Sequence, residues 1–170
     1  MQAGLLNEDG RARGAIASVY QNLSFEEIEP LLPAIHHAIV EPAPSGTMFA
    51  DNIRLSGLDL MSQLGIEEGM QLSIDLVELD RWGSGKRMPK CLTALQRYGS
   101  AAKGLIPQLE QFKQHFAKKR RLSDKNKSNL KILNETIRII ADTPPPKLRP
   151  MPQPSTQVGP TQPSGRNDGF

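Results

Sequence analysis

The sequence has few of the residues on which disulfide-stabilised, metal-binding and membrane proteins depend. Among its 170 residues there is one cysteine, Cys91, which excludes an intramolecular disulfide and a cysteine-based metal cluster. No apolar run approaches the roughly 20 residues that a membrane-spanning helix needs. The N-terminus lacks a basic region followed by an apolar stretch, so we expect no secretory signal. We therefore expect a soluble protein, and the sequence assigns it no compartment.

Residues with the spacing of a catalytic or metal-binding site are missing as well. His36 and His37 are neighbours on one expected helix, so their side chains point about 100° apart and cannot hold one metal ion together. Glu26 and Glu27 fall in the first turn of that helix, where the helix dipole favours negative charge. Residues 83–87, Gly-Ser-Gly-Lys-Arg, lack the strand and the spacing of a phosphate-binding loop, and we interpret them as a linker. We expect no catalytic residue, no metal site and no cofactor.

Composition divides the chain into two parts. Residues 143–170 contain 8 of the 14 prolines and almost no aliphatic side chains. Such a segment cannot bury enough apolar surface to offset the entropy lost on ordering, so it predicts a disordered, proline-rich tail. Residues 1–142 are long enough to bury a hydrophobic core, and we expect them to form one helical domain.

Apolar residues recur at helical spacing through most of residues 1–142. The pattern predicts pairs of antiparallel helices joined by short turns, followed by a closing helix. Ser24 and Glu27 predict a capping box at the start of the second helix. Gly65 predicts a left-handed turn between the two helices of the middle pair. The expected hairpins and closing helix cover about residues 11–40, 52–79, 88–117 and 128–141.

Residues 65–79, GIEEGMQLSIDLVEL, are apolar around more of the helix circumference than any other long stretch. A helix of this kind must be covered by neighbours on more than one side, so we expect it between the first and third hairpins. We expect Cys91 to be buried, because it shares an apolar register with Leu92 and Leu95. Trp82 lies in the linker after the middle hairpin, and we expect it to fill the seam between hairpins.

The helical pairs share a repeat. Gly65 and Gly99 are 34 residues apart, and each ends a first helix and opens a second. Pro33 and Pro107 are 74 residues apart, twice 37, within the matching strings LLPAI and LIPQL; the middle pair lacks this proline. A helix–turn–helix unit that recurs in this range is typical of a stacked α-solenoid. A compact helical bundle is the alternative that the pattern leaves open.

Residues 98–109, YGSAAKGLIPQL, resemble the core of a HEAT-type repeat, with its glycine turn, small residues and a proline before a leucine. Residues 25–116 as a whole are similar to the HEAT-repeat end of large bacterial proteins. The resemblance implies an all-α fold, a short right-handed α-solenoid of about three HEAT-like helical hairpins plus a closing C-terminal helix. It also implies a scaffold or protein-binding role, and it leaves open that the chain is the C-terminal part of a larger protein.

Charge is unevenly distributed along the chain. Residues 1–112 carry 9 basic and 14 acidic side chains, whereas residues 113–131 carry 8 basic side chains and one acidic side chain. Such a cluster attracts nucleic acids, anionic surfaces or acidic proteins, although a solvated loop between two helices is the simpler interpretation. The candidate contact residues for a polyanion or a partner are Lys118, Lys119, Arg120 and Arg121.

Together these features favour a non-enzymatic scaffold or protein-binding module whose partner is a protein. Such a module predicts an exposed groove along the second helices of the pairs. Two alternatives remain: binding of nucleic acid or another polyanion through residues 113–131, and a non-catalytic appendage of a larger enzyme. The sequence specifies neither the identity of the partner nor the oligomeric state.

Overall fold

The structure is a computed structural model, and most of it is helical. It describes residues 1–79, 81–118, 121 and 123–152, apart from the side chain of residue 21. In this part of the chain there is no β-strand, and the extended contacts are isolated bridges between Asp9 and Ser45 and between Ile66 and Arg149. The predicted all-α fold class is confirmed.

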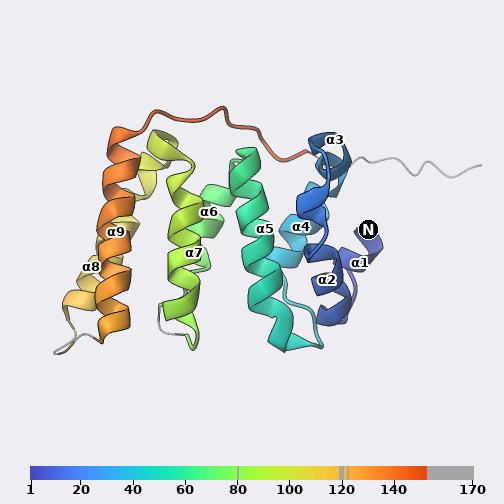
Figure 1. Ribbon diagram of the computed structural model, residues 1–170, viewed down its shortest axis with the longest axis horizontal. Helices are drawn as coiled ribbons and strands as arrows, with labels where there is room; N and C mark the ends of the chain where they lie inside the picture. Colours follow the sequence, from blue (N-terminus) through green and yellow to red (C-terminus); the bar gives the residue numbers. More distant parts are fainter. Residues whose placement is uncertain (80, 119–120, 122, 153–170) are drawn as a thin grey trace, which may run out of the picture.

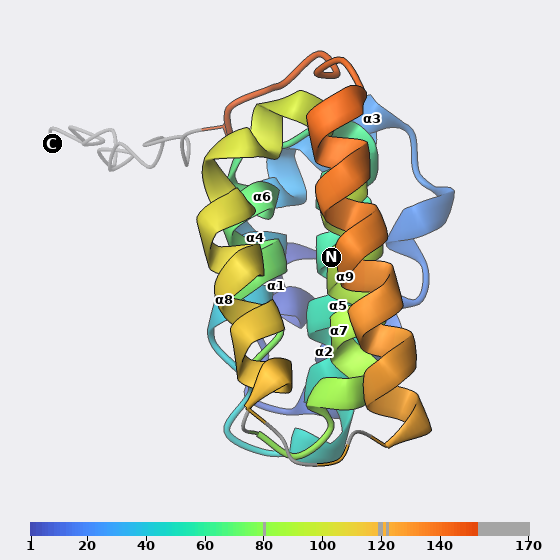
Figure 2. The ribbon, with the colours of Figure 1, turned by 90° about the vertical axis from the view of Figure 1, so that its left-hand side faces the viewer.

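The helices lie in two rows. In Figure 1 one row lies in front of the other, and in Figure 2 the two rows are seen end-on, side by side. The first row contains α2 (Gly10–Ala17), α5 (Ala50–Leu64), α7 (Ser84–Gln96) and α9 (Asp124–Asp142), and the second contains α4 (Leu32–Val40), α6 (Glu68–Asp75) and α8 (Ile106–Ala117). Each helix of the first row packs against the next one in that row, and α6 packs against α5 and α7. The short α1 (Gln2–Leu5) packs against α2 and α4 at the N-terminal end.

The second helix of the first pair is broken, which corrects the continuous helix expected before residue 40. It consists of α3 (Phe25–Ile28), the 3₁₀ segment η2 (Glu29–Leu31) and α4. Pro33 lies in the first turn of α4, where its missing N–H leaves no intrahelical bond unmade. Pro107 has the equivalent place in α8, after the 3₁₀ segment η4 (Gly99–Leu105). Both prolines therefore start a helix.

Two helices of the first row begin four residues earlier than predicted. Helix α7 begins at Ser84, directly after Gly83, whose φ is +88°, so residues 84–87 belong to the helix and not to a linker. Helix α9 begins at Asp124, because the side chain of Ser123 caps it by accepting a hydrogen bond from the backbone N–H of Asn126 at 3.2 Å. Glycine, serine and proline near these starts hid the helical pattern.

Pro89 lies inside α7 and has no N–H to donate to the carbonyl of Gly85, four residues earlier. The side chain of Asn129 on α9, which is only 3% exposed, donates to this carbonyl from Nδ2 at 3.5 Å. The closing helix therefore provides the hydrogen bond that the proline removes from its neighbour.

Two predictions at helix ends are confirmed. The side chain of Ser24 accepts a hydrogen bond from the N–H of Glu27 at 3.4 Å, and the Glu27 carboxylate accepts from the N–H of Ser24 at 2.8 Å. Gly65 ends α5 with φ of +69°, in the left-handed region that glycine adopts without steric cost. Gly99 adopts the same conformation, with φ of +48°. The two repeat-related glycines therefore make similar turns.

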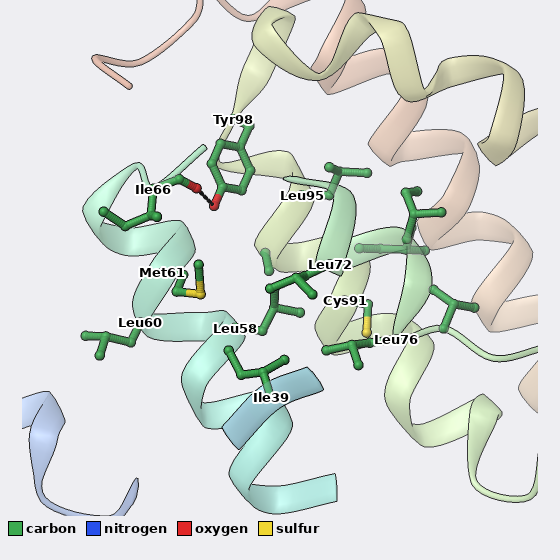
Figure 3. Packing of buried hydrophobic residues seen from close by; sticks show 14 of the residues in the cluster. Ile39, Leu58, Leu60, Met61, Ile66, Leu72, Leu76, Cys91, Leu95 and Tyr98 are labelled. Carbon is green, nitrogen blue, oxygen red and sulfur yellow. Dashed lines mark hydrogen bonds between the residues drawn. The ribbon is translucent and has the colours of Figure 1, made fainter. Parts of the chain in front are cut away.

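The two turns are joined by a buried hydrogen bond. Tyr98 Oη, directly before the Gly99 turn, donates to the carbonyl of Ile66, directly after the Gly65 turn, at 2.8 Å (Figure 3). Both residues are at most 1% exposed. Because an unmade buried hydrogen bond is costly, this contact fixes the third helical pair against the second.

The core runs through all the helical pairs without interruption. Within it α6 packs against α5 of its own pair and against α7 of the third pair, and its expected packing against the first pair stays a prediction. Leu72 and Ile74 on α6 and Leu76 directly after it are buried. Figure 3 shows Leu72 and Leu76 between α5 and α7, which both pack against α6. Cys91 on α7 is fully buried, which confirms the prediction, and burial raises the pKa of its thiol to about 12. A thiol with this pKa stays protonated, so Cys91 behaves as an apolar core residue.

After α9 the chain turns back across the ends of the helical pairs, and we call residues 143–152 the strap (Figure 1). The carbonyl of Thr143 accepts a hydrogen bond from the N–H of Ser100 at 2.8 Å, beside the Gly99 turn. The N–H of Arg149 donates to the carbonyl of Gly65 at 2.9 Å. The guanidinium of Arg149 also lies 4.1 Å from the ring centroid of Phe25 on α3. The strap therefore touches all three helical pairs.

The strap differs from the disordered tail that composition predicted from residue 143 onward. Its order comes from main-chain hydrogen bonds to turns that are distant in the sequence, and from partly buried Leu148 and Met151. Composition does not register such contacts. Residues 153–170, the rest of the predicted tail, lie outside the described residues.

The left-handed turn and the strap together predict a specific cost for a side chain at Gly99. A Cβ there would lie 2.6 Å from the carbonyl oxygen of Pro144, whereas a Cβ at Gly104 in the same 3₁₀ segment would meet no atom within 4 Å. We expect Gly99→Ala to lower the free energy of unfolding by about 1–2 kcal/mol. Gly104→Ala, the matched control, should leave it unchanged or raise it slightly. Urea unfolding measures both, and equal effects would contradict the prediction.

Candidate functional site

The basic residues singled out in the sequence lie around the connection between α8 and α9. Lys118 and Arg121 are exposed there, and Lys119 and Arg120 lie outside the described residues. Two flanking lysines are paired locally, Lys113 with Glu110 at 3.0 Å and Lys127 with Asp124 at 2.9 Å. Part of the positive charge of residues 113–131 is therefore balanced by neighbouring carboxylates.

A second group of charges, which sequence reasoning missed, lies where α5, α7 and the α6–α7 connection meet. Glu78 accepts hydrogen bonds at Oε1 from Arg54 at 3.2 Å and from Arg81 at 2.9 Å. Its Oε2 lies 3.2 Å from Nη2 of Arg87. Asp51, in the first turn of α5, accepts from Nη1 of Arg87 at 3.1 Å. Three arginines thus surround two carboxylates, and the cluster carries one net positive charge.

Arg87 is the most deeply placed member of this charge cluster. It is 3% exposed, and its Nη1 donates to the backbone carbonyl of Trp82 at 2.9 Å. Among the described residues its Nε makes no hydrogen bond. A buried guanidinium is stable only where acceptors surround it, so Arg87 fixes the loop at Trp82 and the start of α5 relative to each other.

Glu78 has an unusual backbone conformation for a residue with a side chain, with φ of +43°. Burial by itself raises the pKa of its carboxyl, but the hydrogen bonds and charges of Arg54 and Arg81 outweigh this and hold the pKa below its ordinary value of 4.5. The strained backbone is maintained because it brings the carboxylate within reach of these arginines.

A pocket of about 260 Å³ lies beside the charge cluster, with Arg54, Arg81 and Arg87 in its lining. Met48 and Trp82 also line it, and they are 84% and 92% exposed. Trp82 therefore does not fill the seam between hairpins, as the sequence led us to expect, because Arg87 holds its backbone outside the core. We call Met48, Arg81, Trp82 and this pocket the Trp82 surface.

A groove of about 380 Å³ lies between α5 and α7 and is lined by Leu55, Ser56, Asp59, Pro89, Lys90 and Thr93. It shares both helices with the Trp82 surface, since Asp51 and Leu55 lie one turn apart on α5. An ion pair between Arg97 and Asp59, 2.7 Å long, bridges the two helices farther along. This groove follows the first helices of the pairs, whereas the sequence led us to expect one along the second helices.

One sequence signal could have identified the charge cluster. Arg87 lies four residues before Cys91 and eight before Leu95, so it occupies the apolar face of α7. An arginine in such a register requires a buried partner. The signal was lost because residues 83–87 were assigned to a linker, which removed Arg87 from the helical pattern. Its partner Glu78 lies on a backbone with positive φ, which no local sequence motif predicts.

Comparisons of the chain with protein-family models, with curated proteins and with solved structures gave no match. In the described part of the chain, no helix is both long and apolar enough to cross a lipid bilayer. The same residues contain no group of three or more histidine, cysteine or acidic side chains arranged to hold a metal ion.

The lowered pKa of Glu78 predicts a pH-dependent contribution to stability. The unfolded chain takes up a proton at this carboxyl near pH 4.5, before the folded chain does, so the contribution is present above pH 4.5 and lost as the pH falls below it. We expect Glu78→Gln to lower the free energy of unfolding at pH 7 by about 2 kcal/mol and to flatten its decline below pH 4.5.

Urea unfolding between pH 3 and pH 7 measures this difference. Glu135→Gln is the control, because Glu135 pairs with Arg138 on the exposed face of α9, and it should change stability little at either pH. The account of Glu78 is wrong if Glu78→Gln and the wild-type chain keep the same difference in stability at pH 3 and pH 7.

Proposed function

We propose that this chain is a non-enzymatic protein-binding module, built as a short right-handed α-solenoid of three HEAT-like hairpins and closed by α9. The two rows of helices, the matching turns at Gly65 and Gly99 and the matching helix starts at Pro33 and Pro107 support the repeat. Repeats of this kind build extended surfaces on which other proteins bind.

The exposed Trp82 beside an arginine-lined pocket is the main support for the protein-binding role. Tryptophan, methionine and arginine are the residues enriched at the centres of protein interfaces. Trp82 and Met48 expose large apolar side chains to solvent at the mouth of the pocket. A partner that covered them would gain the full hydrophobic contribution of both side chains.

The Trp82 backbone and the Arg81 side chain of this surface are held in place before any partner arrives. Arg87 bonds the carbonyl of Trp82 to the charge cluster, and Glu78 holds Arg81 at 2.9 Å. Association with a fixed surface costs less conformational entropy than association with a mobile loop. The net positive charge of the cluster favours a partner that offers an apolar recess for Trp82 and an acidic side chain near Arg81.

Binding of a polyanion is the second candidate, and the exposed Lys118 and Arg121 favour it. These residues lie on the connection between α8 and α9, whereas Trp82 lies between α6 and α7. The two functions therefore use different residues and respond differently to salt, since phosphate contacts weaken steeply as salt is raised.

An affinity capture with the full chain as bait separates the two functions. We expect proteins recovered by the wild-type chain at 150 mM salt to be lost with Trp82→Ala, with at least a tenfold fall in affinity once a partner is purified. Val19→Ala is the matched control, because Val19 is an exposed apolar residue that follows α2 and is not among the residues lining the pocket, and it should retain the partner.

One double variant tests the polyanion alternative. If the protein-binding proposal is right, changing Lys118 and Arg121 together to serine should leave the amount of captured protein unchanged. Full recovery with Trp82→Ala, combined with loss in the serine variant and in high salt, would overturn the proposal in favour of polyanion binding.

A further inference from the structure

The strap binds through its backbone as an added strand would. The N–H of Arg149 donates to the carbonyl of Gly65 at 2.9 Å, and its carbonyl accepts from the N–H of Glu67 at 3.0 Å. Two residues farther on, the N–H of Met151 donates to both carboxylate oxygens of Glu68 at 3.2 Å. The residue between them is Pro150, which has no N–H. Both N–H groups of residues 149–151 are therefore used, as alternate N–H groups are in an extended peptide on a sheet edge.

The surface beneath the strap has the shape and the polar groups of a receptor for such a peptide. A Cβ at Gly65 would lie 2.6 Å from the carbonyl oxygen of Lys147, and one at Gly99 would lie 2.6 Å from that of Pro144. Both glycines thus allow a second backbone to approach closely. The N–H groups of Glu67 and Ser100 lie at the starts of second-row segments, where a helix does not use them.

Side chains add a sequence preference to this backbone recognition. Arg149 stacks on Phe25 with 4.1 Å between its guanidinium carbon and the ring centroid. Leu148 and Met151 are partly buried against the core. The prolines at 144–146 and 150 favour the extended conformation before binding, which reduces the entropy lost on binding. The bound pattern is a proline-rich stretch followed by leucine, arginine, proline and methionine.

We propose that the ends of the helical pairs form a binding site for an extended, proline-rich peptide of a partner protein, and that the strap occupies this site in cis. We call the receptor residues, which are Phe25, Gly65, Glu67, Glu68, Gly99 and Ser100, the turn track. A partner segment with an apolar residue, an arginine and a proline in this order makes the same contacts and replaces the strap. The site is separate from the Trp82 surface and from the function proposed for it.

The strap is joined directly to α9, so its effective concentration at the track is of the order of millimolar. A free peptide of the same sequence therefore competes poorly with it. Weakening the strap without altering the track should release the site. Arg149 and Leu148 are the substitutions of choice, because the Arg149 side chain stacks on Phe25 of the track, the Leu148 side chain packs against the core, and neither residue belongs to the helices.

The test uses the full chain and a fluorescein-labelled peptide with the sequence of residues 143–152. We expect the double variant Leu148→Ser, Arg149→Ala to bind this peptide at least tenfold more tightly than the wild-type chain does, by fluorescence anisotropy. Adding Glu68→Gln to that variant should weaken binding about tenfold, because it removes the charge that accepts from the N–H of Met151. Trp82→Ala in the same background should leave binding unchanged.

Two results would overturn the proposal. One is equal affinity of the strap variant and the wild-type chain for the peptide, whatever its value, since the strap would then not occupy the site. The other is undiminished binding after Glu68→Gln. Arg149→Ala alone provides a milder strap variant should the double variant fold poorly, and it should give an intermediate affinity. Circular dichroism checks that each variant keeps its helical content.

Discussion

At Gly65 and Gly99 the backbone adopts positive φ, and the rest of the structure depends on these two turns. Each turn sends the chain from the first row of helices to the second. Tyr98 joins the two turns by donating to the carbonyl of Ile66 within the core. The strap crosses the outer side of both turns. Its carbonyl oxygens lie 2.6 Å from the position that a Cβ would occupy on Gly65 or on Gly99. Each position therefore requires glycine for two reasons: the turn needs a positive φ, and the strap backbone passes too close to leave room for a Cβ.

Helical periodicity predicted the all-α fold because the core is continuous and each helix buries an apolar stripe. Periodicity failed at proline, which can interrupt a helix, begin one or lie within one. Pro33 was expected inside a continuous helix, and it lies instead in the first turn of a new one. Pro89 lies within α7 only because Asn129, forty residues later, supplies a hydrogen bond to the carbonyl of Gly85. Compensation from a distant helix has no local signature.

The surfaces were harder to predict than the helices. The basic run at 118–121 is conspicuous in sequence because its charges are consecutive, whereas the charge cluster draws Arg54, Glu78 and Arg87 from three separate segments. Composition assigned the strap to a disordered tail because its order depends on backbone groups of other turns. The charge cluster and the ordered strap were missed for the same reason. Polar contacts between distant segments produce neither a periodic pattern in the sequence nor a bias in composition.

Successive helical pairs are fixed side by side by the hydrogen bond between their turns and by the strap that crosses them. Backbone amide hydrogen exchange of the full chain, resolved residue by residue by NMR, measures how firmly the strap is held. The amides of Glu67, Ser100 and Arg149 should exchange at least about a hundredfold more slowly than in an unstructured peptide, because each donates across the strap contact. Exchange of these three amides at unstructured rates, with the helices still protected, would contradict the claim.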